Sequence, residues 1–351
     1  MVDARLIMMG VGVGYVFSIL SSYRSQCLFG DSCNYKDLPH YNPRNKLRRG
    51  AHDLSSAYFL LVLIWGGNSI VNKLAASTIE PSAMSFYRWF VAMLILTPFC
   101  LPSTIRKWPT VKRYLSKLAF LALLGMVLNQ SLGYYAGLTT TATNMSLITS
   151  FVPLMSVFIS LPLLNKPISA LSVVGGVLSL SGLAYMLGEG NPLFFLHQSV
   201  TEGDALMVMA ALVYALYCVL LKRWKMPFSN WTLIYLQGVC AVFMLTPLWL
   251  TSDHLLPTEG SISLIAYAGI AASLLAPWMW VKAIDAIGAD STAMFMNLLP
   301  VFSVSLAATL LGETVHPYHL IGGLLVISGV ALSQLKLPRR NDDGVEKVTQ
   351  V

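Results

Sequence analysis

The sequence predicts an all-α integral membrane protein, with ten transmembrane helices in two inverted five-helix repeats. Three observations lead to this prediction. The chain of 351 residues is 56% hydrophobic and only 11% charged, whereas a soluble domain carries about 25% charged residues. The apolar residues fall in runs long enough to cross a bilayer, which takes roughly 20 residues. A stretch of sequence from the middle of the chain is also repeated near its end.

The apolar runs are expected to be helices, because backbone amides in lipid have no water to bond. They are also too long and too uniformly apolar for barrel strands. We expect spans at residues 57–76, 83–101, 116–137, 141–164, 169–188, 204–222, 230–250, 262–282, 290–311 and 317–335.

The distribution of Lys and Arg predicts the orientation of these spans. If the residues before the first span are cytoplasmic, the basic residues fall in inner loops, such as 102–115, and the outer loops are acidic. Lys73, at the end of the first span, is the exception. This split follows the positive-inside rule, so both termini are expected to be cytoplasmic. The basic residues form short clusters between spans, which argues against nucleic acid as a partner despite the net charge of +7.

The ends of the chain carry weaker signals. Residues 1–56 are expected to form a poorly ordered extension, because the apolar stretch from Leu6 to Leu20 is short for a span. An eleventh helix, or a start codon placed too far upstream, are the alternatives. Residues 336–351 form a polar cytoplasmic tail. The five cysteines show no metal-binding spacing, so we expect no metal and no cofactor.

The repeated phrase divides the chain. LLNKPISALSVVGGVLSLSGLAYML at 163–187 returns as LLGETVHPYHLIGGLLVISGVAL at 310–332, at a shift of 147 positions. This places the first repeat at 57–188 and the second at 204–335, joined by a periplasmic connector at 189–203. Five helices per repeat is an odd number, so the second repeat enters the membrane from the opposite side, as in many secondary transporters. Lys166 therefore ends a helix inside, and its equivalent Glu313 ends one outside.

Two further features recur at matched places. Gly175 and Gly182 are seven positions apart, as are Gly322 and Gly329, so each pair lies on one helix face and permits close packing. We expect the fifth and tenth helices to use these glycines, either within one chain or against a second subunit as a homodimer. Pro153 and Pro300 are expected to kink the fourth and ninth helices, and a hinge is the sharper hypothesis.

Polar residues within spans tend to face a cavity or a partner helix, because they are costly in lipid. Earlier parts of the two halves align at a shift of 149, which places Arg88 on Gln237. The candidates for binding a small-molecule substrate are Asn68, Asn72, Tyr87, Arg88, Asn129, Gln130, Tyr134, Asn144, Gln237, Trp278 and Asn297. Interhelical hydrogen bonding is the alternative role for several of them.

Arg88 is the strongest candidate, because its guanidinium is always charged and its planar fork suits a carboxylate. Alternatively, Arg88 reaches outward to lipid headgroups, or pairs with helix carbonyls or with Glu80. No carboxylate lies deep within a span. Glu313, Asp285 and Asp290 lie near helix ends and are expected to be solvated, which favours facilitated diffusion or exchange over a carboxylate proton relay.

A carrier that works by alternating access is the leading interpretation. A membrane-embedded enzyme and a non-transporting scaffold are the alternatives. The six histidines lie outside the spans or at their edges, so no catalytic arrangement with a nucleophile can be recognised. The absence of a GK[ST] phosphate-binding loop argues against ATP-driven pumping by this chain alone.

Three stretches resemble the EamA-type members of the drug/metabolite transporter superfamily. They are WGGNSIVNKLAASTIEPSAMSFYRWFVAMLILTPF at 65–99, GYYAGLTTTATNMSLITSFVPLMSVFISLPLL at 133–164 and AIDAIGADSTAMFMNLLPVFSVSLAATLLGETVHPYHLIGGLLVISGVAL at 283–332. The first half departs from the family pattern, with LNKP in place of LGE. The resemblance implies ten helices in two EamA repeats, a bacterial inner-membrane location and transport, often export, of small metabolites.

Overall fold

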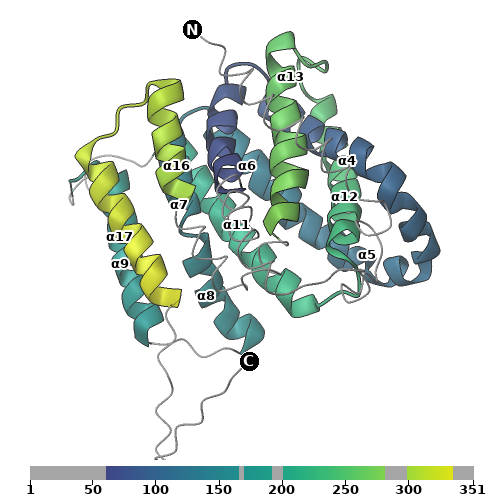
Figure 1. The fold of residues 1–351 in the computed structure, drawn as a ribbon, viewed down its shortest axis with the longest axis horizontal. Coiled ribbons are helices and arrows are strands. Elements are labelled where there is room, and N and C mark those ends of the chain that lie inside the picture. The colour runs from purple at the N-terminus through teal and green to yellow at the C-terminus, as the bar shows by residue number, and fades with distance from the viewer. Residues whose placement is uncertain (1–60, 166–169, 192–200, 281–298, 335–351) are drawn as a thin grey trace, which may run out of the picture.

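The structure, a computed structural model, describes residues 61–165, 170–191, 201–280 and 299–334, and these residues form a bundle of helices (Figure 1). No strand occurs in these ranges. The predictions for residues 1–56 and 336–351, for most of the connector, and for Lys166, Asp285, Asp290 and Asn297 lie outside them.

The first repeat begins with a helix whose described part covers 61–75. It continues with α4 (Pro81–Arg106), then α5 (Trp108–Ala122), the π-helix η2 (Leu123–Leu128) and α6 (Asn129–Ala136), which run on without a break. The last elements are α7 (Ala142–Thr149), α8 (Val152–Leu164) and α9 (Ala170–Leu187).

The second repeat follows the same order. It contains α11 (Glu202–Trp224), α12 (Asn230–Leu250) and α13 (Glu259–Ala266), which continues into the π-helix η3 (Tyr267–Leu275). Then come α16 (Leu299–Leu306), the π-helix η4 (Ala307–Leu311) and α17 (Pro317–Gln334).

Seven helical segments in the described ranges are long and apolar enough to cross a membrane. The segments Leu299–Leu311 and Pro317–Ser333 are apolar but shorter. The chain is therefore a multi-pass membrane protein, and its described helices fall at the ten predicted places. Ten complete spans remain a prediction.

Short polar side chains cap the N-termini of several of these helices. Thr141 Oγ1 accepts the Asn144 amide of α7 at 3.0 Å, and Thr201 Oγ1 accepts the Asp204 amide of α11 at 3.1 Å. Such capping satisfies amide donors that have no partner in the first turn. Ser229 caps α12 in the same way, so α7, α11 and α12 each begin with a capped first turn.

The predicted helix 141–164 is broken in the structure. Its two parts are α7 and α8, which meet at Ser150 and Phe151, two residues before Pro153. Proline lacks an amide hydrogen and crowds the preceding turn, so it interrupts the helical hydrogen bonds there. The helix is interrupted next to Pro153, where a kink was predicted, and a role of Pro153 as a hinge stays a prediction. Pro300 is the second residue of the described α16, so the structure does not describe the turn before it.

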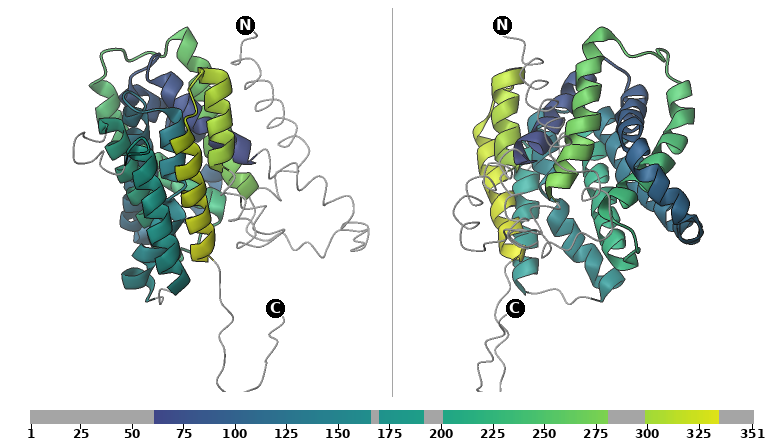
Figure 2. Two further views of the ribbon diagram at one scale, coloured as in Figure 1. Left: turned by 90° about the vertical axis from the view of Figure 1, so that its left-hand side faces the viewer. Right: turned by 45° about the vertical axis from the view of Figure 1, so that its right-hand side comes forward.

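Equivalent helices of the two repeats pack side by side and run antiparallel. Figures 1 and 2 show α9 beside α17 along their length. Ser172 Oγ, near the start of α9, donates to the Ser333 carbonyl near the end of α17 at 3.1 Å. At the centre, Ser179 Oγ donates to the Val326 carbonyl at 3.0 Å, and these positions are 147 apart, which is the repeat shift.

The predicted glycines make this packing close. A Cβ on Gly182 would lie 2.7 Å from the Gly322 carbonyl oxygen, and a Cβ on Gly322 would lie 2.7 Å from that of Gly182. Gly175 and Gly329 approach each other in the same reciprocal way. The glycines therefore join the fifth and tenth helices within one chain, which was one of the two predicted uses.

A second equivalent pair shows the same geometry. Ser82, near the start of α4, shares a 2.6 Å hydrogen bond with Ser252, just after α12. Cys100, near the end of α4, donates its thiol to the Trp231 carbonyl near the start of α12. Antiparallel packing of equivalent helices is the arrangement expected of repeats inverted about an axis between them.

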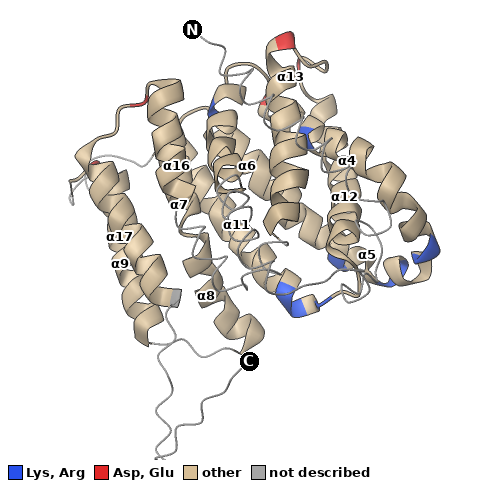
Figure 3. Cartoon of the chain, viewed as in Figure 1, with Lys and Arg blue, Asp and Glu red and all other residues tan. Residues whose placement is uncertain are grey.

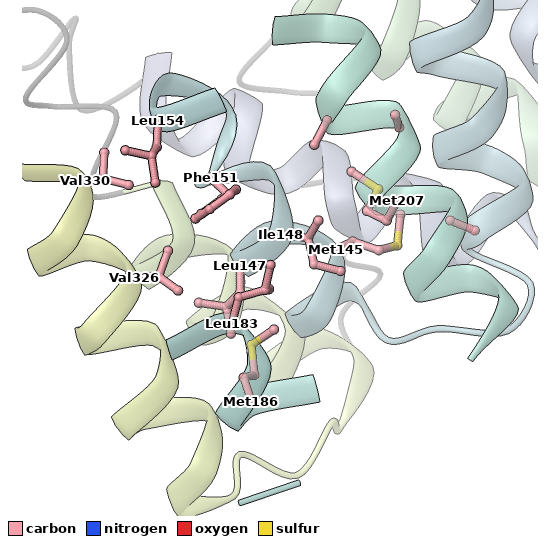
Figure 4. Packing of buried hydrophobic residues seen from close by; sticks show 13 residues of the cluster. Met145, Leu147, Ile148, Phe151, Leu154, Leu183, Met186, Met207, Val326 and Val330 are labelled. Atoms are coloured by element: carbon pink, nitrogen blue, oxygen red, sulfur yellow. The ribbon is translucent and has the colours of Figure 1, made fainter. Parts of the chain in front are cut away.

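Apolar side chains fill the spaces between these helices. One cluster joins α7, α8 and α9 to α11 and α17 through Met145, Ile148, Leu154, Met207 and Val326 (Figure 4). Another joins α4 to α12 through Phe86, Trp89 and Leu245. Since the clusters combine residues of both repeats, the repeats pack as one body.

Charged residues separate along the helix axes (Figure 3). We call the lower end in Figure 3 the basic end. It carries Arg106, Lys107, Lys112, Arg113, Lys117, Lys222, Arg223 and Lys225. The opposite, acidic end carries Glu80, Glu189, Glu202, Asp204, Asp253, Glu259 and Glu313. Lys73 and Arg88 are the exceptions among the described basic residues.

Candidate functional site

Arg88 lies at the centre of a polar cluster that links the two repeats. Its side chain, on α4, is only 4% exposed. Nε donates to Ser273 Oγ of η3 at 2.8 Å, and Nη1 donates to Asn68 Oδ1 at 2.9 Å and to Tyr134 Oη at 3.1 Å. Four elements therefore hold the guanidinium: α4, the helix 61–75, α6 and η3.

No described carboxylate neutralises this cation. The partners of Arg88 in the described ranges are neutral, and its second terminal nitrogen, Nη2, makes no hydrogen bond there. Glu80, the acidic partner considered from the sequence, instead accepts from the backbone amides of Asp253 at 3.1 Å and His254 at 3.4 Å. A buried charge without a counter-charge is costly, so the site favours an anion.

The structure brings four predicted candidates together. Asn68, Tyr134 and Arg88 are hydrogen-bonded, and Asn72 joins them through a 3.5 Å contact from Asn68 Nδ2 to its Oδ1. Tyr134 is 1% exposed, so its ring closes one side of the cluster. The arrangement leaves one terminal nitrogen of the guanidinium without a described partner, and neutral neighbours fix the direction of the side chain.

Sequence reasoning missed Ser273, which orients Arg88 from the second repeat. Ser273 is buried within η3, and its hydroxyl also donates to the Ala268 carbonyl at 2.8 Å, five residues back. π-helical segments often occur at functional sites. An apolar run such as 262–282 gives no signal of where such a segment forms.

Other predicted candidates lie elsewhere. Tyr87 donates to the Leu255 carbonyl at 2.7 Å, in the loop after α12. Asn129 donates to the Ala210 carbonyl of α11 at 3.0 Å, which is interhelical bonding, and accepts from its neighbour Gln130 within α6 at 3.1 Å. Trp278 is half-buried and packs with an apolar cluster.

Gln237 forms a second polar cluster with two tyrosines of α11. Its amide contacts the phenol of Tyr217, and the rings of Tyr217 and Tyr214 stack at a centroid distance of 5.5 Å. Gln237 lies on α12 and Arg88 on α4, and these two helices pack side by side. Tyr214 and Tyr217 are both half-buried.

The segment 137–144, at the acidic end, is held by three charged residues. Lys73 Nζ donates to the carbonyls of Gly137 at 3.0 Å and Thr140 at 2.7 Å, which explains its exceptional place in the charge pattern. The Glu313 carboxylate accepts from the Ala142 amide at 2.8 Å. Glu313 is therefore partly buried and bonded, and the prediction that it is solvated is wrong.

Asp204 is the third residue that holds this segment. It is 4% exposed and accepts hydrogen bonds from Thr140 Oγ1 and, at 3.2 Å, from Asn144 Nδ2. Thr201, at the start of the same helix, also donates to it at 2.6 Å. Asn144 is thus part of a contact between the repeats at the acidic end, and its hydrogen bonds within the described ranges do not include Arg88.

The EamA-like transporter family model matches residues 55–188 and again residues 201–335. The chain belongs to the EamA-like transporter family. These ranges agree with the predicted repeats, and the recognition from the sequence is confirmed.

Several named relatives span most of the chain. A protein of Archaeoglobus fulgidus, named as an uncharacterized transporter, is 27% identical over 79% of this chain and 96% of its own length. A probable terminal-alkyne amino-acid exporter of Streptantibioticus cattleyicolor is 24% identical over 82% and 95%. An S-adenosylmethionine uptake transporter of Rickettsia conorii is 23% identical over 77% and 88%.

A solved crystal structure of another protein shares the fold. Its TM-score is 0.53 at 15% identity, and the match covers 80% of this chain and 96% of the other. Because the relatives are named as transporters, the prediction that the chain is not an enzyme is confirmed.

Proposed function

We propose that this EamA transporter moves a small anionic or zwitterionic metabolite, such as an amino acid, across the bacterial inner membrane, with Arg88 holding the carboxylate. The buried guanidinium without a described counter-charge carries this proposal. Polar groups within the membrane are costly and mark substrate paths. Arg88 also joins elements of both repeats, which is where secondary transporters bind their substrates.

Alternating access follows from the paired geometry. The equivalent helices α9 and α17, and α4 and α12, pack antiparallel, so rocking of one repeat against the other would open the shared interior to either side. At the acidic end, Asp204 and Glu313 of the second repeat hold the segment 137–144 of the first. Opening that end requires these contacts to break, and the kink at Pro153 supplies a hinge.

The charge separation supports an orientation with the basic end and both termini in the cytoplasm. In that orientation the contacts of Asp204 and Glu313 form the periplasmic barrier. Export is the proposed net direction. The two named relatives with stated substrates include one exporter and one uptake transporter, so the same fold serves both directions.

Substitution Arg88→Lys tests the role of the fork, because lysine keeps the charge but cannot bind a carboxylate through two parallel hydrogen bonds. We expect at least a roughly 10-fold loss of carboxylate counterflow in proteoliposomes, since a hydrogen bond to a charged group contributes about 1.5–3 kcal/mol. Arg113→Lys, an exposed change of the same chemistry at the basic end, is the matched control.

Three outcomes would contradict the proposal. Full counterflow by Arg88→Lys would remove Arg88 from the binding site. A loss accompanied by a clearly lower unfolding midpoint, with an equal loss for neutral analogues, would assign Arg88 a structural role. A protein without flux but with intact folding would favour the scaffold alternative.

A further inference from the structure

The cluster around Gln237 contains a buried acceptor without a described partner. Gln237 is 1% exposed, and its Oε1 atom is buried and makes no hydrogen bond. Leaving an amide oxygen unpaired in an apolar interior is costly, so native proteins satisfy such atoms with a protein group, a water or a ligand. The unpaired atom is the amide oxygen, which can only accept a hydrogen bond.

Gln237 occupies the position in the second repeat that Arg88 occupies in the first. The 149-position shift that aligns Arg88 with Gln237 also aligns Asn68 with Tyr217. The contact of Arg88 with Asn68 in the first repeat thus has its counterpart in the contact of Gln237 with Tyr217 in the second. The two clusters occupy equivalent places in the two repeats, but one is a cation and the other is neutral with a free oxygen.

The surroundings favour a donor that carries positive charge. The stacked rings of Tyr214 and Tyr217 lie beside Gln237, and aromatic faces attract cations through their quadrupole. An ammonium group has three donors and no acceptor, which matches a free amide oxygen. Arg88 on α4 and Gln237 on α12 belong to one packed pair of helices, as the contacts of Ser82 with Ser252 and of Cys100 with Trp231 show.

We infer that Gln237, with Tyr214 and Tyr217, forms a subsite for the amino group of the substrate, separate from the carboxylate position at Arg88. This inference rests on the proposed function, because it assumes that Arg88 binds the acid. It adds that the protein distinguishes an amino acid from the same acid without its amino group. Gln237 is therefore a specificity-determining residue.

Three probes of one carbon skeleton test the subsite: hexanoate, norleucine and 6-aminohexanoate. Their inhibition constants are measured by competition in proteoliposomes that contain the full-length protein. We expect one of the two amino acids to bind about 10–100-fold more tightly than hexanoate, as one hydrogen bond from a charged donor provides. The isomer with the lower inhibition constant, norleucine or 6-aminohexanoate, indicates the spacing between the two subsites.

Gln237→Leu should remove this preference while leaving the hexanoate constant unchanged. Gln237→Glu keeps the acceptor and adds negative charge, so its preference for the amino acid should persist or increase. This second variant keeps the test decisive if the leucine variant does not fold. A glutamate variant that loses the preference would show that Gln237 presents its amide hydrogens to the substrate, and would overturn the inference.

The remaining outcomes separate this inference from the proposed function. If the wild type binds hexanoate and both amino acids equally, the subsite fails and the carboxylate site at Arg88 stands. If Gln237→Leu weakens all three probes by the same factor, Gln237 is structural and the inference fails. If the wild type binds none of the probes, the proposed function and the subsite fail together.

Discussion

Replacing Gly182 by alanine should push α9 away from α17. A Cβ at this position would lie 2.7 Å from the Gly322 carbonyl oxygen and 2.6 Å from Leu325 Cβ, whereas ordinary contacts begin at 3.4 Å. The clash involves backbone atoms, which cannot rotate away as the tip of a side chain can. The helices must therefore separate by about 0.7 Å at this point, a shift that reduces dispersion contacts along the interface.

The expected cost follows from two opposing effects. Overpacking a close interface costs about 1–3 kcal/mol. Alanine in a helix is favoured over glycine by about 0.5–1 kcal/mol, which offsets part of this cost. The difference is a fall of about 0–2.5 kcal/mol in the free energy of unfolding, and we expect a value near the middle, about 1 kcal/mol. Gly322→Ala should behave alike, because its Cβ would lie 2.7 Å from the Gly182 carbonyl oxygen.

The double variant provides the sharper test. Once the first alanine has separated the helices, the second needs little further displacement, so the two losses should sum to more than the loss in the double variant. Equilibrium unfolding in detergent measures all three. Ser181→Ala is the control, since Ser181 is exposed and its hydroxyl donates only to Val177 of its own helix. Increased stability of both single variants, with additive effects in the double variant, would refute the close packing of these two helices.

Two further predictions concern the acidic end and the proposed hinge. Glu313→Gln should lower the free energy of unfolding by about 0.5–2 kcal/mol, because its carboxylate caps the first turn of α7 through the Ala142 and Thr143 amides; a thermal unfolding midpoint equal to that of the wild type would contradict this role. Pro153→Ala should allow a straighter fourth helix and slow counterflow while leaving the inhibition constants of competing ligands unchanged; an unchanged rate would leave the kink without a role in gating.

Much of the fold could be predicted because lipid imposes strong constraints on sequence. The lengths of the apolar runs predict where the helices lie in the sequence. The separation of basic from acidic loops predicts which helix ends share a side of the membrane. The repeat then predicts which helices are equivalent, and the matched glycines predict the packing of α9 on α17. Pro153 predicted a kink in this helix, but it did not predict that the helix would divide into α7 and α8.

The candidate site was less predictable, because side-chain direction depends on local helix geometry. Tyr87 and Arg88 are neighbours in sequence, yet one reaches the loop after α12 and the other reaches η3. Ser273 lies in a π-helix that hydropathy does not reveal. Glu313 looked like a solvated loop residue, because its partners come from a segment about 170 positions away in sequence.

Cysteine accessibility in intact cells tests the central claim, that the two repeats are inserted in opposite directions. Lys112 and Asp253 lie at corresponding ends of the two repeats, and both are exposed. Single cysteines at these positions, in a variant without the five native cysteines, are treated with a membrane-impermeant thiol reagent. We predict labelling from outside at position 253 and, only after the membrane is opened, at position 112. Labelling of both from the same side would contradict the inverted arrangement and the carrier mechanism built on it.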